Sequence, residues 1–445
     1  MEGMILPREG AECLARLEQA GYEGYAVGGC VRDLLMGIPP HDTDLTTSAL
    51  PHEIKEVFRD CHCIETGIQH GTVTVLWADT PVEITTFRVD GSYADHRRPE
   101  GVSFTRSLRE DLARRDLTVN ALACDLRGRV VDFFGGTEDL QAGILRAVGD
   151  PCLRFEEDAL RILRTVRFAA VTGFRIEEET EKALLAKAEL LKKISGERKG
   201  EELCKLLCGA HAGDILIRYR EVLRPVIPQL AEQAGFDQKN AHHCFDLLTH
   251  TARVVDAIPA DPALRMAALL HDLGKKETFS LDEQGVGHFY GHAQRSTAIG
   301  TALMEELRFS TAFSHRVTEL IRHHDTPIPE EETLIKKRLN RLGPSLFFDL
   351  LELQRADNVA QHPDYRYRQE GLFRIKRMAE EILERQECFS LRDLAISGKD
   401  LLEIGYSSGK ELGRTLDYLL EKVMEGHLEN KRESLLAEAE AHPCR

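Results

Sequence analysis

A glycine turn, a short helix and a pair of aspartates, in that order, constrain this chain more than any other feature. Residues 25–47 read YAVGGCVRDLLMGIPPHDTDLTT. The apolar start predicts a strand, Gly28 and Gly29 predict a tight turn, and the apolar spacing over residues 31–35 predicts a helix. Backbone N–H groups at such a turn face bound phosphate oxygens. Arg32, in the first helical turn, adds a forked donor for the same anion.

Asp42 and Asp44 flank Thr43 about ten residues after the turn. In a strand, residues two apart face the same side, so both carboxylates are expected to meet at one spot. Paired carboxylate oxygens suit Mg²⁺. A lone pair of aspartates is ordinarily a solvated turn, but beside a phosphate-binding turn it predicts a nucleoside-triphosphate site with metal-assisted phosphoryl chemistry. A P-loop is excluded, because no strand is followed by G-x-x-x-x-G-K-[ST].

The same stretch resembles the signature of the nucleotidyltransferase superfamily, in the branch of bacterial class II CCA-adding enzymes and poly(A) polymerases. The resemblance implies an α+β fold: a polymerase-β-like head with a small mixed sheet, followed by all-helical neck, HD and tail domains. It implies Mg²⁺-dependent transfer of nucleotides from CTP and ATP to the 3′ end of tRNA, without a nucleic-acid template, releasing pyrophosphate. A poly(A) polymerase or an enzyme that adds only A shares every one of these motifs.

A second motif follows the head strands. RRDLTVNALA resembles the family pattern R-R-D-[FL]-T-x-N-A, which implies that Arg115 binds the triphosphate, Asn120 reaches a ribose hydroxyl and Asp116 braces the motif. The preceding residues 87–115 are polar and rich in Gly and Arg, so we expect a mobile loop over the site. In the family such a loop favours A addition or full CCA addition. Glu83, in a predicted strand, is either a third metal-binding carboxylate or a structural charge.

A helix without a breaker is predicted over residues 153–170 (LRFEEDALRILRTVRFAA). Asp158, Arg161, Arg164 and Arg167 recur every third residue and so lie along one face. The simpler interpretation is an exposed helix with weak ion pairs. The alternative is that these side chains bind the nucleotide.

Base selection would follow from one acid and one arginine. A carboxylate accepts from an exocyclic amine, and Arg donates to a ring nitrogen, so such a pair accepts cytosine and adenine but leaves uracil and guanine with unpaired polar groups. The segment resembles the family motif E-D-x-x-R through Glu157, Asp158 and Arg161, with Arg164 and Arg167 serving phosphate or ribose. The following SGERKGEEL resembles the neck motif S-x-E-R-x-x-x-E-L, with Lys199 in place of an apolar residue. The motif implies a role in orienting this helix.

A separate series of histidines and aspartates begins near residue 236. It has the order H…HD…H…HH…D and comprises His250, His271, Asp272, His292, His323, His324 and Asp357. The series resembles the HD superfamily of metal-dependent phosphohydrolases. The resemblance implies a transition metal or Mg²⁺ held by His250, His271, Asp272 and Asp357, and a second metal held by His292 with His323 or, alternatively, His324. Any one histidine alone is more often a core or surface residue, and hydrolase activity as the main function is an open alternative.

Charge and composition limit the partners. The chain has 58 Lys and Arg against 74 Asp and Glu, a net charge of −16, which argues against general coating of nucleic acid. Binding of one structured RNA needs only local basic groups. The basic pairs and runs are Arg97–Arg98, Arg114–Arg115, Lys192–Lys193, Arg198–Lys199 and Lys336–Arg338.

The length of 445 residues predicts about three domains, and the motifs divide the chain into four segments. These are the head (1–150), the neck (151–235), the HD domain (236–365) and a helical tail (366–445), which in the family grips tRNA. The eleven cysteines lack paired C-x-x-C motifs and are expected to be reduced. We expect a cytoplasmic protein without a membrane partner, because no long apolar run or signal peptide is present.

Overall fold

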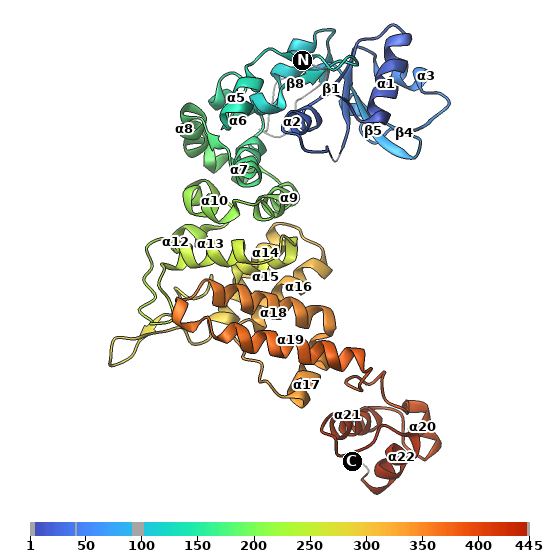
Figure 1. Ribbon diagram of the computed structural model, residues 1–445, viewed down its shortest axis with the longest axis vertical. Coiled ribbons are helices and arrows are strands. Elements are labelled where there is room, and N and C mark those ends of the chain that lie inside the picture. Colours follow the sequence, from blue (N-terminus) through green and yellow to red (C-terminus); the bar gives the residue numbers. More distant parts are fainter. Residues whose placement is uncertain (1–4, 41, 91–101, 443–445) are drawn as a thin grey trace. The chain divides into compact units, whose positions relative to one another are not determined.

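The computed structural model describes residues 5–40, 42–90 and 102–442 (Figure 1). It divides into two compact units, Met1–Glu232 with Glu305–Phe309, and Gln233–Met304 with Ser310–Arg445. The division after Glu232 lies close to the expected boundary between neck and HD domain. The finer division into four segments stays a prediction.

A seven-stranded sheet forms the head, in the order β3-β4-β5-β2-β1-β8-β9. β2 and β5 are parallel and the other neighbours are antiparallel, so the predicted small mixed sheet is confirmed. The strands are β1 (Gly24–Val27), β2 (Asp44–Thr47), β3 (His62–Ile64), β4 (Thr72–Trp77), β5 (Thr80–Thr86), β8 (Leu122–Cys124) and β9 (Val130–Asp132).

Two helices pack on this sheet, α1 (Arg8–Gln19) and α3 (Pro51–Val57). Alternate residues of β4 and β5, such as Val73 and Ile84, are fully buried against them. The two-residue period predicted for these strands therefore places one face of the sheet in the core. The opposite side chains of β5, including Glu83, are left exposed.

The prediction of a loop over residues 87–115 is wrong for both of its ends. Strands β6 (Arg88–Asp90) and β7 (Val102–Phe104) pair antiparallel, and α4 covers Leu108–Ala113. The helix begins there because the Ser107 hydroxyl accepts a hydrogen bond from the Glu110 N–H, as an N-cap residue does. Residues 91–101, with Arg97 and Arg98, lie outside the described residues.

The neck is helical, but the single helix predicted over residues 153–170 is wrong. It is broken into α6 (Pro151–Glu157) and α7 (Leu160–Thr172). Asp158 is extended, with φ −136° and ψ 104°, and its carboxylate accepts a hydrogen bond from the Leu160 N–H at 3.1 Å. An aspartate that bonds to the backbone two residues ahead competes with helical hydrogen bonding. Asp158 therefore lies at the junction of two helices, not on one face with the arginines.

The remaining elements of the first unit are mostly short helices. They are α2 (Gly29–Leu35), α5 (Gly136–Ala142), α8 (Glu178–Lys187), α9 (Gly196–Leu207), α10 (Ala212–Arg218), α11 (Arg220–Leu223) and α12 (Pro228–Glu232), 3₁₀ turns at Ile68–His70, Thr118–Asn120 and Ala188–Lys193, and the parallel pair β10 (Ile144–Leu145) and β11 (Arg175–Ile176).

The second unit is helical, as predicted, apart from the hairpin β12 (Ser280–Leu281) and β13 (Gly287–His288). Its helices are α13 (Leu247–Ala257), α14 (Pro262–Leu270), α15 (His292–Glu306), α16 (Thr311–His323), α17 (Glu332–Leu342), α18 (Pro344–Val359), a 3₁₀ turn (Pro363–Tyr365), α19 (Arg368–Glu384), α20 (Gly398–Glu403), α21 (Lys410–Met424) and α22 (Arg432–Ala441). None of the helices in the described ranges is long and apolar enough to cross a membrane.

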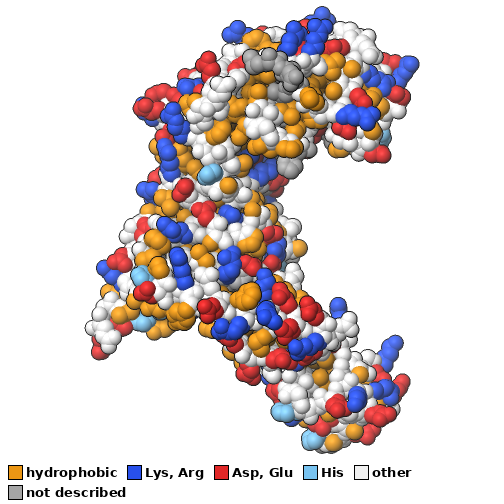
Figure 2. All heavy atoms as spheres, viewed as in Figure 1, with side chains coloured by type: hydrophobic (Ala, Val, Ile, Leu, Met, Phe, Trp, Pro, Cys, Tyr) orange, Lys and Arg blue, Asp and Glu red, His pale blue; other side chains and the backbone are white. Residues whose placement is uncertain are grey.

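The charged side chains are mixed rather than segregated. On the face drawn in Figure 2, Lys and Arg alternate with Asp and Glu over the helices of the second unit. Every basic group singled out above that lies in the described ranges has a member paired with an acid: Arg114 lies 2.9 Å from Asp111, Lys192 2.7 Å from Glu189, Arg198 2.9 Å from Asp158 and Lys336 2.7 Å from Glu332. The described cysteines are free thiols, as expected.

Candidate functional site

The turn between β1 and α2 needs glycine. Gly28 has φ +70° and ψ −130°, a conformation that other residues rarely adopt. A Cβ atom at this position would lie 2.7 Å from Nη1 of Arg115. The backbone of the turn and the Arg115 guanidinium therefore adjoin each other, and the structure brings together the two motifs expected to bind one triphosphate.

The carboxylates lie beside this turn. Ala26 of β1 pairs with Leu45 of β2, so Asp44, the first residue of β2, lies next to the end of β1. Asp44 is also the register partner of Glu83 on β5. Asp42 precedes the strand, which corrects the expectation that both aspartates lie on it, although both line one pocket.

These carboxylates repel one another, and the repulsion bears on the pKa of Asp44. Its partial withdrawal from water within the pocket raises its pKa, and the neighbouring charges of Glu83 and Asp42 raise it further, while Arg115 opposes the shift. Like charges held on paired strands are stabilised by a cation between them. The donor set of exposed carboxylate oxygens is of the kind that Mg²⁺ prefers.

A chain of hydrogen bonds joins the turn to the neck. Nη1 of Arg32 donates to Oδ1 of Asn120 at 2.7 Å, and Nδ2 of Asn120 donates to Oδ1 of Asp116 at 3.1 Å. The other oxygen of Asp116 accepts from Nε of Arg164 on α7 at 2.8 Å. Burial alone would raise the pKa of Asp116, but the charge of Arg164 and the hydrogen bonds from Asn120, Arg164 and the Leu117 N–H together hold the pKa below its ordinary value. Asp116 thus braces the motif, and both polar groups of the Asn120 side chain are engaged within the protein.

Neighbouring side chains anchor the acid and the arginine proposed to select the base. Oδ2 of Asp158 lies 2.9 Å from Nη2 of Arg198, the arginine of the neck motif. Nη1 of Arg161 donates to Glu157 at 2.7 Å, and its Nη2 donates to the backbone carbonyl of Arg114 at 2.7 Å. The two side chains therefore have defined orientations in the unliganded protein.

Glu202, the second glutamate of the neck motif, contacts two arginines of α7. Its carboxylate lies 2.6 Å from Nε of Arg167 and 3.7 Å from Nη1 of Arg164. Glu202 is buried on α9, which packs against α7. Arg198 thus binds the residue at the helix break, and Glu202 binds the helix that follows it.

One pocket of about 740 Å³ brings together all eleven residues singled out in the head and neck. They are Gly28, Gly29, Arg32, Asp42, Asp44, Arg115, Asn120, Asp158, Arg161, Arg164 and Arg167. Sequence reasoning did not identify Phe168 and Lys205, which also line the pocket. Phe168 could have been found from its place among the α7 arginines, because it lies four residues after Arg164 on the same helical face.

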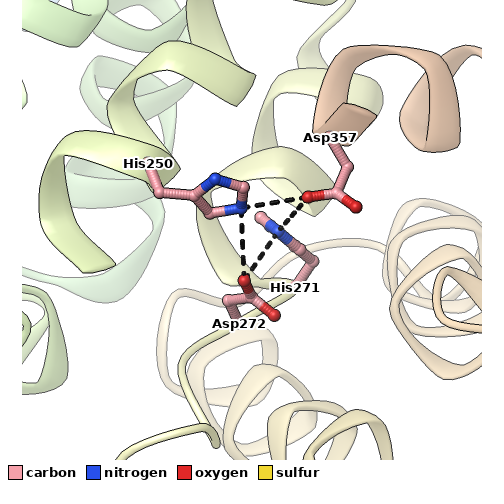
Figure 3. Close-up of side chains that lie close together, drawn as sticks. All are labelled: His250, His271, Asp272 and Asp357. Atoms are coloured by element: carbon pink, nitrogen blue, oxygen red, sulfur yellow. Dashed lines mark ion pairs between the residues drawn. The ribbon is translucent and has the colours of Figure 1, made fainter. Parts of the chain in front are cut away.

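The second unit holds the histidine and aspartate cluster (Figure 3). Nε2 of His250, on α13, lies 3.0 Å from Asp357 at the end of α18 and 3.4 Å from Asp272. Nε2 of His271, at the end of α14, lies 3.2 Å from Asp272. The four ligand atoms lie within 4.8 Å of one another, as a single metal ion requires.

Hydrogen bonds orient the imidazoles of this cluster. Nδ1 of His271 contacts the carbonyl of Ala268 at 2.7 Å, and Nδ1 of His250 contacts the carbonyl of Ala360 at 3.4 Å. A carbonyl can only accept, so Nδ1 carries a proton, and Nε2 is the ring nitrogen that faces the carboxylates of the cluster. Both Nε2 atoms and Oδ1 of Asp272 are buried without a hydrogen-bond partner among the described residues, whereas Oδ2 of Asp272 pairs with Lys275. These orphaned atoms fit a divalent metal.

A second group shares Asp272. Nε2 of His292 lies 3.5 Å from Oδ1 of Asp272, and Nε2 of His324 lies 3.7 Å from the same oxygen. The choice of His323 for this position is wrong. His323 points toward Glu319, one helical turn earlier, at 3.5 Å, whereas His324 follows the end of α16 and turns toward Asp272.

Lys275 is a further charged group of the cluster that sequence reasoning missed. Its buried ammonium lies 2.7 Å from Oδ2 of Asp272 and 3.1 Å from the side-chain oxygen of Gln238. Its position one helical turn after the HD pair was the available signal.

The mixed sheet, the glycine turn and the adjacent carboxylates define a nucleotidyltransferase. Residues 24–146 match the "Poly A polymerase head domain", residues 173–233 the "RNA and SrmB- binding site of polymerase A", and residues 292–439 the "tRNA nucleotidyltransferase domain 2". Among its relatives, the chain is 36% identical to the CCA-adding enzyme of Lactobacillus helveticus over 428 residues, which are 95% of this chain and 94% of the relative. It belongs to the family of CCA-adding enzymes.

Two further comparisons support the assignment to the family of CCA-adding enzymes. The chain is 36% identical to the CCA-adding enzyme of Enterococcus faecalis over 434 residues, covering 97% of this chain and 95% of the relative. Its structure is similar to that of the Bacillus stearothermophilus CCA-adding enzyme in complex with CTP, with a TM-score of 0.73, 30% identity and 98% coverage of both chains.

Proposed function

We propose that this chain adds C, C and A to the 3′ end of tRNA, taking the nucleotides from CTP and ATP without a nucleic-acid template. The 3′ hydroxyl of the tRNA attacks the α-phosphorus of the nucleotide, and pyrophosphate leaves. The observation that carries the proposal is a single pocket lined by three carboxylates of the head together with an acid and an arginine of the neck. The membership of the family supports it.

Each group in the pocket has a task in this proposal. Arg32 and Arg115 bind the triphosphate beside the glycine turn, because guanidinium forks match phosphate oxygens. Asp42 and Asp44, with Glu83 adjacent, would hold Mg²⁺, which when bound activates the attacking hydroxyl and neutralises the charge on the leaving group. The repulsion already present at Asp44 fits such a cation.

Base selection falls to Asp158 and Arg161. The carboxylate accepts from the exocyclic amine of C or A, and the guanidinium donates to the adjacent ring nitrogen. Uracil and guanine present the opposite order and would leave buried groups unpaired. Because Arg198 and Glu157 hold the two side chains in place, the pair can select without a template strand. The choice of CTP and ATP follows from this arrangement, and the membership of the family supports tRNA as the partner.

The test is nucleotide incorporation into tRNAs that lack one, two or three of the terminal nucleotides, with each triphosphate supplied separately. We expect C incorporation on the two shorter tRNAs and A incorporation on the third. In Asp44→Asn, incorporation should fall by about 1,000-fold or more, because several kcal/mol of transition-state stabilisation is lost. Asp60→Asn, a surface carboxylate of the same head, is the matched control. Absence of C incorporation with CTP alone would instead favour an A-adding enzyme or a poly(A) polymerase.

We infer a second activity from the His and Asp cluster: metal-dependent hydrolysis of a phosphate ester. His250, His271, Asp272 and Asp357 would hold a transition metal or Mg²⁺, which supplies an activated water when bound. His292 and His324 would hold a second ion with Asp272. The orphaned, buried Nε2 and carboxylate atoms support this inference.

Metal content separates this second site from the first. Elemental analysis of purified His271→Ala should show less bound metal than the wild type, and His324→Ala should show a smaller loss. His323→Ala, one residue away and outside the cluster, is the control and should keep the wild-type content. Release of phosphate from p-nitrophenyl phosphate should survive in Asp44→Asn and vanish in His271→Ala. Equal metal content in wild type and His271→Ala would refute the site.

A further inference from the structure

Three arginine side chains of the nucleotide pocket converge on the ring of Phe168. The guanidinium carbons of Arg167, Arg32 and Arg164 lie 3.9, 5.0 and 5.6 Å from the ring centroid. Phe168 is on α7, lines the pocket and is only 5% exposed. A guanidinium within about 6 Å of an aromatic centroid is attracted by the negative face of the ring, most strongly where water is excluded.

The three cations also pair with acids on different parts of the chain, and Arg164 also lies 3.7 Å from Glu202, the partner of Arg167. The ion pairs are Arg32–Asp33 (2.7 Å), Arg164–Asp116 (2.7 Å) and Arg167–Glu202 (2.6 Å). None of these acids contacts all three cations, whereas the ring of Phe168 does. Without the ring, only Glu202 and the hydrogen-bonded pair Asn120–Asp116, among the described residues, would oppose the mutual repulsion of the guanidinium groups.

We propose that Phe168 is a positioning residue of the nucleotide site. Its ring holds the guanidinium groups of Arg32, Arg164 and Arg167 where their remaining N–H donors meet the incoming triphosphate. Arg32 comes from the glycine turn and the other two from α7, so the ring links the phosphate-binding turn to the neck. This role rests on the proposed nucleotidyl transfer.

The proposal differs in its consequences from plain core packing. A packing residue can be replaced by another apolar side chain with a loss of stability only. A positioning ring cannot, because an aliphatic side chain lacks the π face that attracts the arginines. The loss should appear in the KM for the nucleotide. It should be equal for CTP and ATP, because the triphosphate is common to both.

The experiment measures kcat and KM for CTP and ATP in tRNA incorporation by the full-length protein, together with the midpoint of thermal unfolding. Phe168→Leu removes the π face and Phe168→Tyr restores it. Phe155→Leu is the matched control, since Phe155 is fully buried on α6 and does not line the pocket. Phe168→Met serves the same comparison if the leucine variant does not fold.

For Phe168→Leu we expect the KM for both triphosphates to rise by the same factor, about 5- to 30-fold, with kcat within about threefold of the wild type. Phe168→Tyr should return KM to near the wild-type value, and Phe155→Leu should lower the unfolding midpoint with an unchanged KM. An unchanged KM in active Phe168→Leu, or an equal rise in Phe155→Leu, would overturn the positioning role. A wild-type protein without incorporation would instead defeat the proposed function itself.

Discussion

Replacing Gly28 with alanine tests whether the glycine turn and Arg115 act as one phosphate-binding unit. The backbone at Gly28 has φ +70° and ψ −130°, which an alanine adopts only under strain. The added Cβ would lie 2.7 Å from Nη1 of Arg115. That atom is the far end of a flexible side chain, so the guanidinium moves away rather than the strand.

Two separate magnitudes follow from this geometry. The backbone strain costs about 1–3 kcal/mol of the free energy of unfolding. Displacement of Arg115 removes a hydrogen bond to a charged phosphate, which contributes about 1.5–3 kcal/mol. The second effect corresponds to a fall in kcat/KM of about 10- to 150-fold, because each 1.4 kcal/mol is a factor of ten.

Gly37→Ala separates the two effects. Gly37 also has a positive φ, +72°, but a Cβ there meets nothing within 4 Å. Denaturant unfolding of both variants should show a loss of stability. Steady-state incorporation of C and A should show a loss of kcat/KM in Gly28→Ala alone. If Gly28→Ala keeps a kcat/KM within about twofold of that of Gly37→Ala, the turn and Arg115 do not bind the triphosphate together, and their closeness has no role in catalysis.

Two further predictions concern ion pairs made by arginines of the neck, Arg164 with Asp116 and Arg198 with Asp158. The pKa of Asp116 is below its ordinary value, so the ionised carboxylate contributes fully to stability above about pH 4, and this contribution is lost as the pH falls through the lowered pKa. We expect the free energy of unfolding of Asp116→Asn to be about 1–3 kcal/mol below that of the wild type at pH 7. In denaturant titrations this difference should shrink below pH 4. Arg198→Ala removes the charge-assisted anchor of Asp158, and the preference for CTP over UTP in a competition assay should fall by about tenfold. An unchanged preference would show that Asp158 is held without the neck motif.

Much of the head could be predicted because its signals are local. The turn at Gly28 follows from what only glycine tolerates, and the strands follow from a two-residue alternation that the sheet needs to bury one face. The pairing of Asp44 with Glu83 was harder, because it depends on a parallel register between β2 and β5. No local pattern specifies which strands become neighbours, so Glu83 was left between a metal-binding and a structural role.

The helix break at Asp158 shows where periodicity misleads. The apolar residues on both sides of it continue with helical spacing, and aspartate is not a strong breaker. What interrupts the helix is a hydrogen bond from the Leu160 N–H to the Asp158 carboxylate, with the other oxygen held by Arg198 forty residues later in the sequence. A tertiary ion pair thus stabilises a local alternative that propensity alone leaves undecided. At this junction the backbone of Asp158 is extended, so its side chain points in a direction that a position inside a helix would not allow.

The choice between His323 and His324 could have been made from the sequence, with one further step of reasoning. In α16 the buried apolar residues Val317, Leu320 and Ile321 lie seven, four and three positions before His324. Residues with this spacing share one helical face, so that face turns His324 toward the core, where Asp272 lies. His323 is rotated by about 100° from it and meets Glu319 instead. Rotation about the helix axis therefore decides which of two neighbouring histidines can bind the metal. The apolar face of the helix indicates that rotation, whereas the order of the histidines in the sequence does not.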